Sequence, residues 1–85
     1  MSDTLPDRLA DCSPGTRLVY LSVVRIQPAT TSDLASETFL TETTVRRALS
    51  ELRDLGAVQP LSARDGRRRL WVTAERARTA LGTQG

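Results

Sequence analysis

The stretch that decides the fold of this 85-residue chain is Thr41-Glu-Thr-Thr-Val-Arg-Arg-Ala-Leu-Ser-Glu-Leu-Arg-Asp-Leu55, then Gly56, then Ala57-Val-Gln-Pro-Leu-Ser-Ala-Arg-Asp-Gly-Arg-Arg-Arg-Leu-Trp-Val-Thr73. Its first part predicts an amphipathic helix over 41–55, because apolar residues recur there at helical spacing. Thr41 is expected to cap this helix and Gly56 to end it. The apolar stripe is formed by Val45, Ala48, Leu49 and Leu52, and the opposite face by Thr43, Arg46, Arg47 and Ser50.

The second part predicts a β-hairpin over 58–73. Asp65-Gly66 is a strong signal for a two-residue turn. A turn there pairs Arg64 with Arg67, Leu61 with Leu70 and Gln59 with Val72. Strand alternation then predicts that one face packs on the core while the other points away from it. The expected core face holds Leu61, Leu70 and Val72, and the other face holds Pro60, Arg69 and Trp71. For Trp71 we favour a packing role over stacking on Arg69 or covering a dimer seam.

Outside this stretch, further cap and turn signals divide the chain. Ser13-Pro14 predicts the start of a helix that runs to about Arg25. Thr30 to Asp33 has capping-box spacing and predicts a short helix to about Thr38, followed by a turn at Phe39-Leu40. A last short helix is expected over 74–81, and a very short strand near Ala29 is a further option. We therefore predict a tail over 1–12, one domain over 13–81 and a frayed end over 82–85.

Two of these segments carry expectations about burial. In the first helix, the inward face is expected to hold Val19, Tyr20, Val23 and Val24, and the opposite face Leu18, Ser22 and Arg25, with Leu21 at the border. In the second helix, Leu34 and Ala35 are expected to point inward. The tail is expected either to dock one short turn on the body or to stay loose.

Composition excludes most catalytic chemistry. The chain has no histidine, and all twelve basic residues are arginine. Histidine-assisted nucleophiles, phosphate-binding lysines and ordinary zinc sites are therefore ruled out. We expect no enzyme activity, no cofactor and no metal. The single cysteine, Cys12, cannot form an internal disulfide; we expect it to be inert, the alternative being an intermolecular disulfide.

Charge is uneven along the chain although the net charge is only +2. Residues 1–39 carry three arginines against five acids, whereas residues 40–85 carry nine arginines against five acids. This asymmetry favours an anionic partner for the C-terminal half over a merely solvated surface. There is no apolar run long enough for a membrane span and no signal-peptide pattern, so we expect no membrane association and a cytoplasmic location.

The two ends of the decisive stretch suit the two grooves of DNA. A helix with a polar, arginine-bearing face can enter the major groove, and a hairpin tip with four arginines can reach phosphates or the minor groove. The pattern therefore predicts a mainly helical winged helix-turn-helix: three helices, a two-stranded wing over 58–73 and a short C-terminal helix.

Several strings, in this order and spacing, resemble MarR-like winged helix-turn-helix transcription regulators, in particular their small single-domain archaeal relatives. They are Thr30-Thr-Ser-Asp-Leu-Ala35, Leu40-Thr-Glu-Thr-Thr-Val-Arg-Arg-Ala-Leu49, Leu52-Arg-Asp-Leu-Gly-Ala-Val58, Arg64-Asp-Gly-Arg-Arg68 and Leu70-Trp-Val-Thr73. The resemblance covers residues 13–73. The chain departs from the family where Phe39 replaces the usual glycine of the turn; Phe39 is expected either to cap the core or to lie exposed as an anchor. It also lacks the long terminal helices that build a small-molecule pocket, so ligand sensing is not expected.

The resemblance implies a sequence-specific regulator of transcription that binds double-stranded DNA as a homodimer. It gives helix 41–55 the role of recognition helix, with Asp65 bracing the wing tip and Arg67 entering the minor groove. The expected DNA-binding residues are Thr41, Thr43, Arg46, Arg47, Ser50, Arg64, Arg67, Arg68 and Arg69. The expected dimer surface uses leucines that the three-helix core does not need: Leu5, Leu9, Leu18, Leu21 and Leu81. The alternative to a dimer is a monomer whose tail and last helix fold back over these leucines. The alternative function is that of a winged-helix adaptor that binds proteins and has no DNA affinity.

Overall fold

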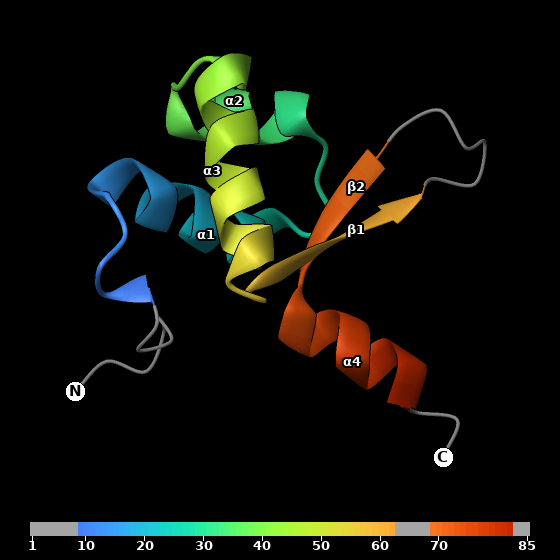
Figure 1. Ribbon diagram of the computed structural model, residues 1–85. Coiled ribbons are helices and arrows are strands. Elements are labelled where there is room, and N and C mark those ends of the chain that lie inside the picture. Colours follow the sequence, from blue (N-terminus) through green and yellow to red (C-terminus); the bar gives the residue numbers. More distant parts are fainter. Residues whose placement is uncertain (1–8, 63–68, 83–85) are drawn as a thin grey trace.

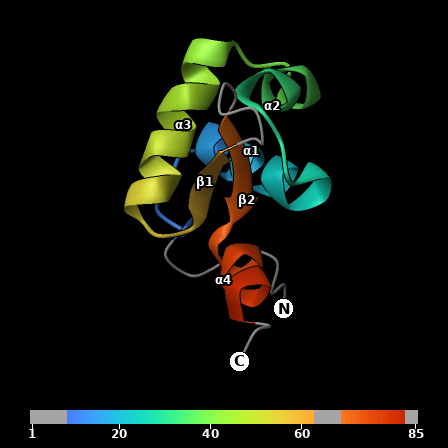
Figure 2. The ribbon, with the colours of Figure 1, turned by 90° about the vertical axis from the view of Figure 1, so that its right-hand side faces the viewer.

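The computed structural model describes residues 9–62 and 69–82. Figure 1 shows the order of its elements, which are α1 (Pro14–Ile26), α2 (Thr31–Thr38), α3 (Glu42–Asp54), β1 (Val58–Ser62), β2 (Arg69–Thr73) and α4 (Ala74–Gly82). α1, α2 and α3 pack on one another, and β1 and β2 form an antiparallel pair beside them. The α2–α3 turn and α4 lie at opposite ends of the molecule (Figures 1 and 2). The predicted fold class is confirmed: a mainly helical winged helix-turn-helix.

Local signals set the helix boundaries. The Ser13 side chain accepts a hydrogen bond from the Thr16 N–H and caps α1. Thr30 and Asp33 form the predicted capping box at the start of α2. After α3, Gly56 has a φ of 76°, a left-handed conformation that a side chain disfavours and that ends the helix as predicted.

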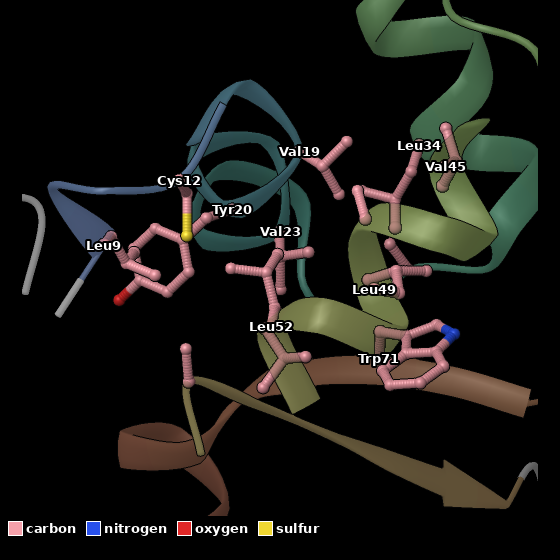
Figure 3. Packing of buried hydrophobic residues seen from close by; sticks show 14 residues of the cluster. Leu9, Cys12, Val19, Tyr20, Val23, Leu34, Val45, Leu49, Leu52 and Trp71 are labelled. Carbon is pink, nitrogen blue, oxygen red and sulfur yellow. The ribbon is translucent and has the colours of Figure 1, made fainter. Parts of the chain in front are cut away.

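The core lies between the three helices and the hairpin (Figure 3). The predicted α3 stripe is confirmed, because all four of its residues are at most 4% exposed. Val19 and Val23 meet it from α1 and Leu34 from α2, all three fully buried. Burying a side chain of this size stabilises the fold by roughly 1.5–3 kcal/mol, so this cluster holds the three helices together.

The predicted inward face of α1 is partly wrong. Val24 is 38% exposed, whereas Ser22, expected outside, is 4% exposed. Val19, Tyr20 and Val23 are buried as predicted. The buried face is thus turned toward Thr16 and Ser22, because α1 also packs on residues that precede it in the chain.

Those residues are 9–12, which end just before Ser13, the N-cap of α1. Leu9 is fully buried and Cys12 is 7% exposed, and both belong to the core. The Arg17 guanidinium holds this segment by donating to the carbonyl oxygens of Ala10 and Cys12, each at 2.9 Å. The expectation that the core does not use Leu9 is therefore wrong, and residues 9–12 dock on the body. Leu5 and the side chain of Leu81 lie outside the described part.

The hairpin has the predicted register. Leu61 pairs with Leu70, and Gln59 pairs with Val72; the predicted pair of Arg64 and Arg67 lies outside the described residues. The short strand near Ala29 is also confirmed, as an isolated bridge to Trp71. The Trp71 N–H donates to the Ala29 carbonyl at 2.7 Å, and the Ala29 N–H donates to the Trp71 carbonyl at 3.1 Å.

The predicted faces of the hairpin are wrong for Leu61 and Trp71, whereas the predicted burial of Val72 is confirmed. Trp71 is 6% exposed and belongs to the core beside Leu49 (Figure 3), which confirms its packing role but places it on the core side. Leu61, expected inside, is 43% exposed, and Leu70 is half-buried. Val72 is buried, although it does not belong to the main core cluster. The reason is that α4 packs against both strands and covers the second face of the sheet near its base.

Candidate nucleic-acid interface

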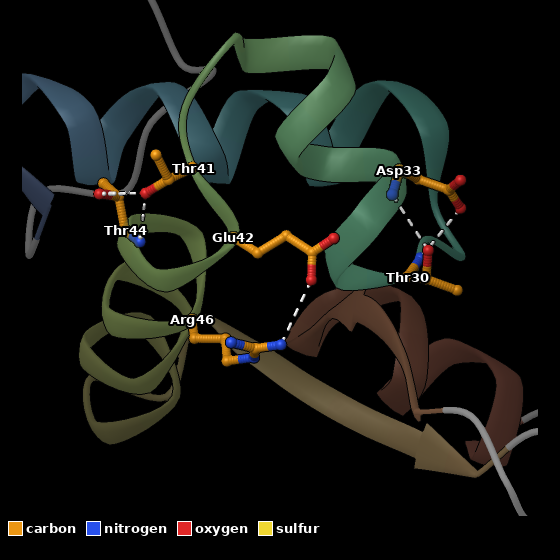
Figure 4. A network of polar contacts seen from close by, with 6 residues as sticks. All are labelled: Thr30, Asp33, Thr41, Glu42, Thr44 and Arg46. Atoms are coloured by element: carbon orange, nitrogen blue, oxygen red, sulfur yellow. Dashed lines mark hydrogen bonds and ion pairs between the residues drawn. The ribbon is translucent and has the colours of Figure 1, made fainter.

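The start of α3 is fixed by two threonines. The Thr44 N–H donates to the Thr41 hydroxyl oxygen at 3.1 Å, and the Thr41 hydroxyl donates to the Thr44 hydroxyl oxygen at 2.9 Å (Figure 4). Thr41, a predicted DNA-binding residue, is exposed but is engaged as the N-cap of the helix. Its first role is therefore to define where α3 begins and how its first turn is presented.

The predicted polar face of α3 is exposed along its whole length. Thr43, Arg46, Arg47 and Ser50 are all exposed, opposite the buried stripe. Because the stripe is anchored on α1 and α2, the polar face is held in a fixed direction. The structure thus brings these four predicted residues together on one surface.

The two arginines of this face differ in their surroundings. The Arg46 guanidinium lies 3.2 Å from the Glu42 carboxylate, one turn earlier (Figure 4). Both side chains are about half exposed or more, and such a pair stabilises a helix by only about 0.3–0.5 kcal/mol. Arg47 has no carboxylate partner within the described residues. The i, i+4 spacing of Glu42 and Arg46 is a signal from which this pair could have been predicted.

The charges of α3 cancel. Between Glu42 and Asp54 the helix carries three arginines and three acids. Glu42 stands in the first turn, whereas Glu51 and Asp54 stand in the last turn and leave the middle of the helix positive. α3 therefore offers directed hydrogen-bond donors at Arg46 and Arg47 but little net attraction for a polyanion.

The concentrated positive charge lies at the hairpin. Arg69 is exposed at the start of β2, opposite Ser62. The other three predicted wing residues, Arg64, Arg67 and Arg68, and the predicted brace Asp65 lie outside the described residues. The structure therefore places the base of the wing and one of its four arginines.

The base of the wing is tied to the end of α1. The Gln27 Oε1 atom accepts a hydrogen bond from the Thr73 N–H at 2.8 Å and another from its hydroxyl at 3.2 Å. Together with the bridge between Ala29 and Trp71, these bonds fix the direction of the hairpin relative to the helices. No local signal in the sequence marks Gln27, since its partner Thr73 lies 46 residues away.

A second polar cluster joins the start of α1 to α3. The Thr16 hydroxyl donates to Glu51 Oε1 at 3.0 Å. Burial raises the pKa of the Cys12 thiol, and the nearby Glu51 carboxylate raises this pKa further. A buried thiol with a raised pKa is a poor nucleophile. In the described ranges no three potential metal ligands lie together, and no helix there could cross a membrane.

Comparison with known proteins identifies the architecture. No family model and no curated protein matches the sequence. Among solved structures, a probable transcriptional regulator from Pseudomonas aeruginosa matches 85% of this chain at 20% identity and a TM-score of 0.73. A MarR family transcription regulator matches 88% at 17% identity and a TM-score of 0.70. FabT from Streptococcus pneumoniae, solved in complex with DNA, matches 87% at 18% identity and a TM-score of 0.68.

The fold is that of MarR-family transcription regulators. The chain spans about half the length of these structures, which it covers to 55%, 59% and 52%. In this MarR-type fold, α2, the turn and α3 form the helix-turn-helix, and β1 and β2 form the wing. The expected relation to the small archaeal members stays a prediction.

Proposed function

We propose that this chain is a sequence-specific regulator of transcription that binds double-stranded DNA. The observation that carries the proposal is the exposed face of α3, where Arg46 and Arg47 stand opposite a fully buried stripe. The fold of the chain is similar to that of FabT, which was solved in complex with DNA, and this similarity supports the proposal. In the proposed complex α3 lies in the major groove, with Thr43, Arg46, Arg47 and Ser50 toward the base edges. The proposal assigns no catalytic activity. A regulator must share a compartment with the DNA that it binds, so the proposal also implies a cytoplasmic location.

Affinity and specificity are divided between the two elements. Because the charges of α3 cancel, most of the attraction to phosphates must come from the wing. Arg64, Arg67, Arg68 and Arg69 are proposed to contact phosphates or the minor groove. Contacts to phosphates position a protein on the duplex, whereas contacts to base edges read the sequence. Specificity is accordingly assigned to α3.

We also propose that the regulator is a homodimer. Leu18 is 41% exposed on α1, and Leu21 is half-buried nearby on the same helix. A two-fold dimer would place two recognition helices about 34 Å apart on a palindromic site. Sedimentation at micromolar concentration should give twice the chain mass of 9.3 kDa, and Leu18→Asp should return the monomer. A wild-type mass of one chain, both free and on DNA, would reject the dimer.

Binding of fluorescent genomic duplexes at low and moderate salt tests the main proposal. The wild type should bind, with log K falling linearly as log salt rises. Arg67→Ala with Arg68→Ala should flatten the slope by roughly one to two, since each phosphate contact contributes about 0.9. The double variant Arg76→Ala, Arg78→Ala removes the same charge from α4 and should change the slope of log K against log salt less. Absence of binding at both salt concentrations would favour the protein-binding adaptor.

A further inference from the structure

The turn between α2 and α3 holds an unusual residue. Phe39 is 94% exposed, so its ring touches almost nothing in the protein. Its backbone is left-handed, with φ 63° and ψ 22°, and its N–H closes α2 by donating to the Ala35 carbonyl at 2.9 Å. Glycine adopts this conformation freely, whereas a side chain such as that of phenylalanine is strained there.

Two separate unfavourable free-energy terms therefore arise at Phe39. The backbone conformation is unfavourable for phenylalanine, and the ring is left in water although it could gain by burial. Neither cost is offset inside the described fold, because the next residue, Leu40, supplies the apolar contact of the turn with the core. The fold does not use the Phe39 ring, and the backbone conformation at this position favours glycine. The presence of phenylalanine therefore points to a contact outside the chain.

The position of the turn indicates the partner. Phe39 lies two residues before Thr41, the cap of α3, at the end of the helix that the proposed function directs into the major groove. The exposed residues nearest to it in the chain are polar: Ser36, Glu37, Thr41 and Glu42. Protein interfaces are centred on contiguous apolar clusters, whereas an isolated phenylalanine suits the thymine methyl group in the major groove.

We propose that Phe39 is a DNA-contacting residue that packs its ring on an apolar edge of the duplex beside the start of α3. The edge is either a thymine methyl group or the carbon face of a deoxyribose. This inference rests on the proposed function and deepens it, since it adds an apolar contact to the polar ones of α3. It also explains the residue that departs from the glycine expected at this turn.

The test uses the full chain and two kinds of variant. Phe39→Gly and Phe39→Asn both suit a left-handed backbone, and asparagine keeps the turn stiffer. Both should leave the melting temperature unchanged or raise it by up to about 5 °C. Both should weaken binding to a duplex enriched from genomic fragments by about tenfold, as expected for burial of part of a phenylalanine ring. Phe39→Tyr retains the ring and should bind like the wild type.

Replacing thymidine by deoxyuridine in that duplex distinguishes a contact with the thymine methyl group from a contact with the deoxyribose. If the ring contacts a methyl group, the replacement weakens wild-type binding but not binding by Phe39→Gly; if it contacts a sugar, both proteins respond equally. Wild-type affinity in both Phe39→Gly and Phe39→Asn would overturn the inference while leaving the proposed function intact. A wild type that binds no duplex would overturn both. A lower mass of Phe39→Gly in sedimentation, with DNA affinity per chain unchanged, would assign the ring to a protein contact instead.

Discussion

The Arg46 guanidinium lies 3.2 Å from the Glu42 carboxylate on the exposed face of α3. The pair holds Arg46, one of the two arginines on the α3 face that is proposed to contact DNA, and places a negative charge on that face. Since both side chains are largely exposed, the pair is weak in the free protein and is easily exchanged for a contact with DNA.

Glu42→Gln should therefore strengthen DNA binding. Removal of the carboxylate frees Arg46 for its proposed contact with a base edge and removes a negative charge that repels phosphates, so the affinity for DNA should rise most at low salt, where this repulsion is least screened. The matched control is Glu75→Gln, which makes the same charge change in the first turn of α4, at the other end of the molecule. Weaker binding by Glu42→Gln would show instead that Glu42 positions Arg46 for its contact.

Leu49 should be essential for stability. Its side chain is 1% exposed between the helices and Trp71, so Leu49→Ala leaves a cavity and should cost about 2–5 kcal/mol. For a domain of this size each kcal/mol lowers the melting temperature by about 4–8 °C. Leu61→Ala is the control, because Leu61 is 43% exposed, and should cost less than about 1 kcal/mol. Equal melting temperatures for the two variants would show that the buried stripe has been misplaced.

Cys12 should make stability fall at alkaline pH. Burial, and then the neighbouring Glu51 carboxylate, raise the pKa of the folded thiol above its ordinary value. As pH rises past that ordinary value, the unfolded chain loses the thiol proton first while the folded chain keeps it. The free energy of unfolding is therefore flat with respect to this group at lower pH and falls as pH rises further.

Denaturant melts across the alkaline range check this expectation, with Cys12→Ala as the control that lacks the group. The difference in unfolding free energy between wild type and variant should shrink as pH rises. The native thiol should also react with a thiol reagent many times more slowly than the unfolded one. A native rate equal to the unfolded rate would contradict the burial of Cys12.

Local signals in the sequence were enough to predict the helices and the hairpin register. Caps such as Ser13 and Thr41 act within one helical turn, and the apolar stripe of α3 has a single period. Both could therefore be predicted from the local sequence, without knowledge of the tertiary structure. The exposed face of α3 followed from the same stripe. The positions of Thr43, Arg46, Arg47 and Ser50 on one surface could therefore be predicted, whereas their contacts with DNA remain predictions.

Features that depend on distant partners could not be predicted. In Leu70-Trp71-Val72 both faces of the strand are apolar, so alternation alone does not tell which faces the core. The bridge from Ala29 to Trp71 and the packing of α4 on the sheet decide it. The burial of Leu9 likewise depends on Arg17, whose guanidinium binds backbone carbonyls of the preceding segment. Nor does the sequence give the φ of Phe39, since that angle is set by how α2 must end before α3 begins.

In the proposed complex α3 reads the base sequence. Arg47 tests this role most sharply, because no carboxylate holds it in the described part of the chain. The measurement is the ratio of affinities for a duplex enriched by selection and for its scrambled counterpart. Arg78→Ala, an exposed arginine on α4, is the matched control for loss of one positive charge.

The wild type should prefer the selected duplex by a factor of about 10³ or more. Arg47→Ala should lower that ratio roughly tenfold to hundredfold, because a good arginine–guanine contact is worth about 1–3 kcal/mol, while Arg78→Ala should leave the ratio unchanged. A wild-type ratio near one, or a ratio in Arg47→Ala equal to that in Arg78→Ala, would contradict the assignment of α3 as the element through which Arg47 reads DNA.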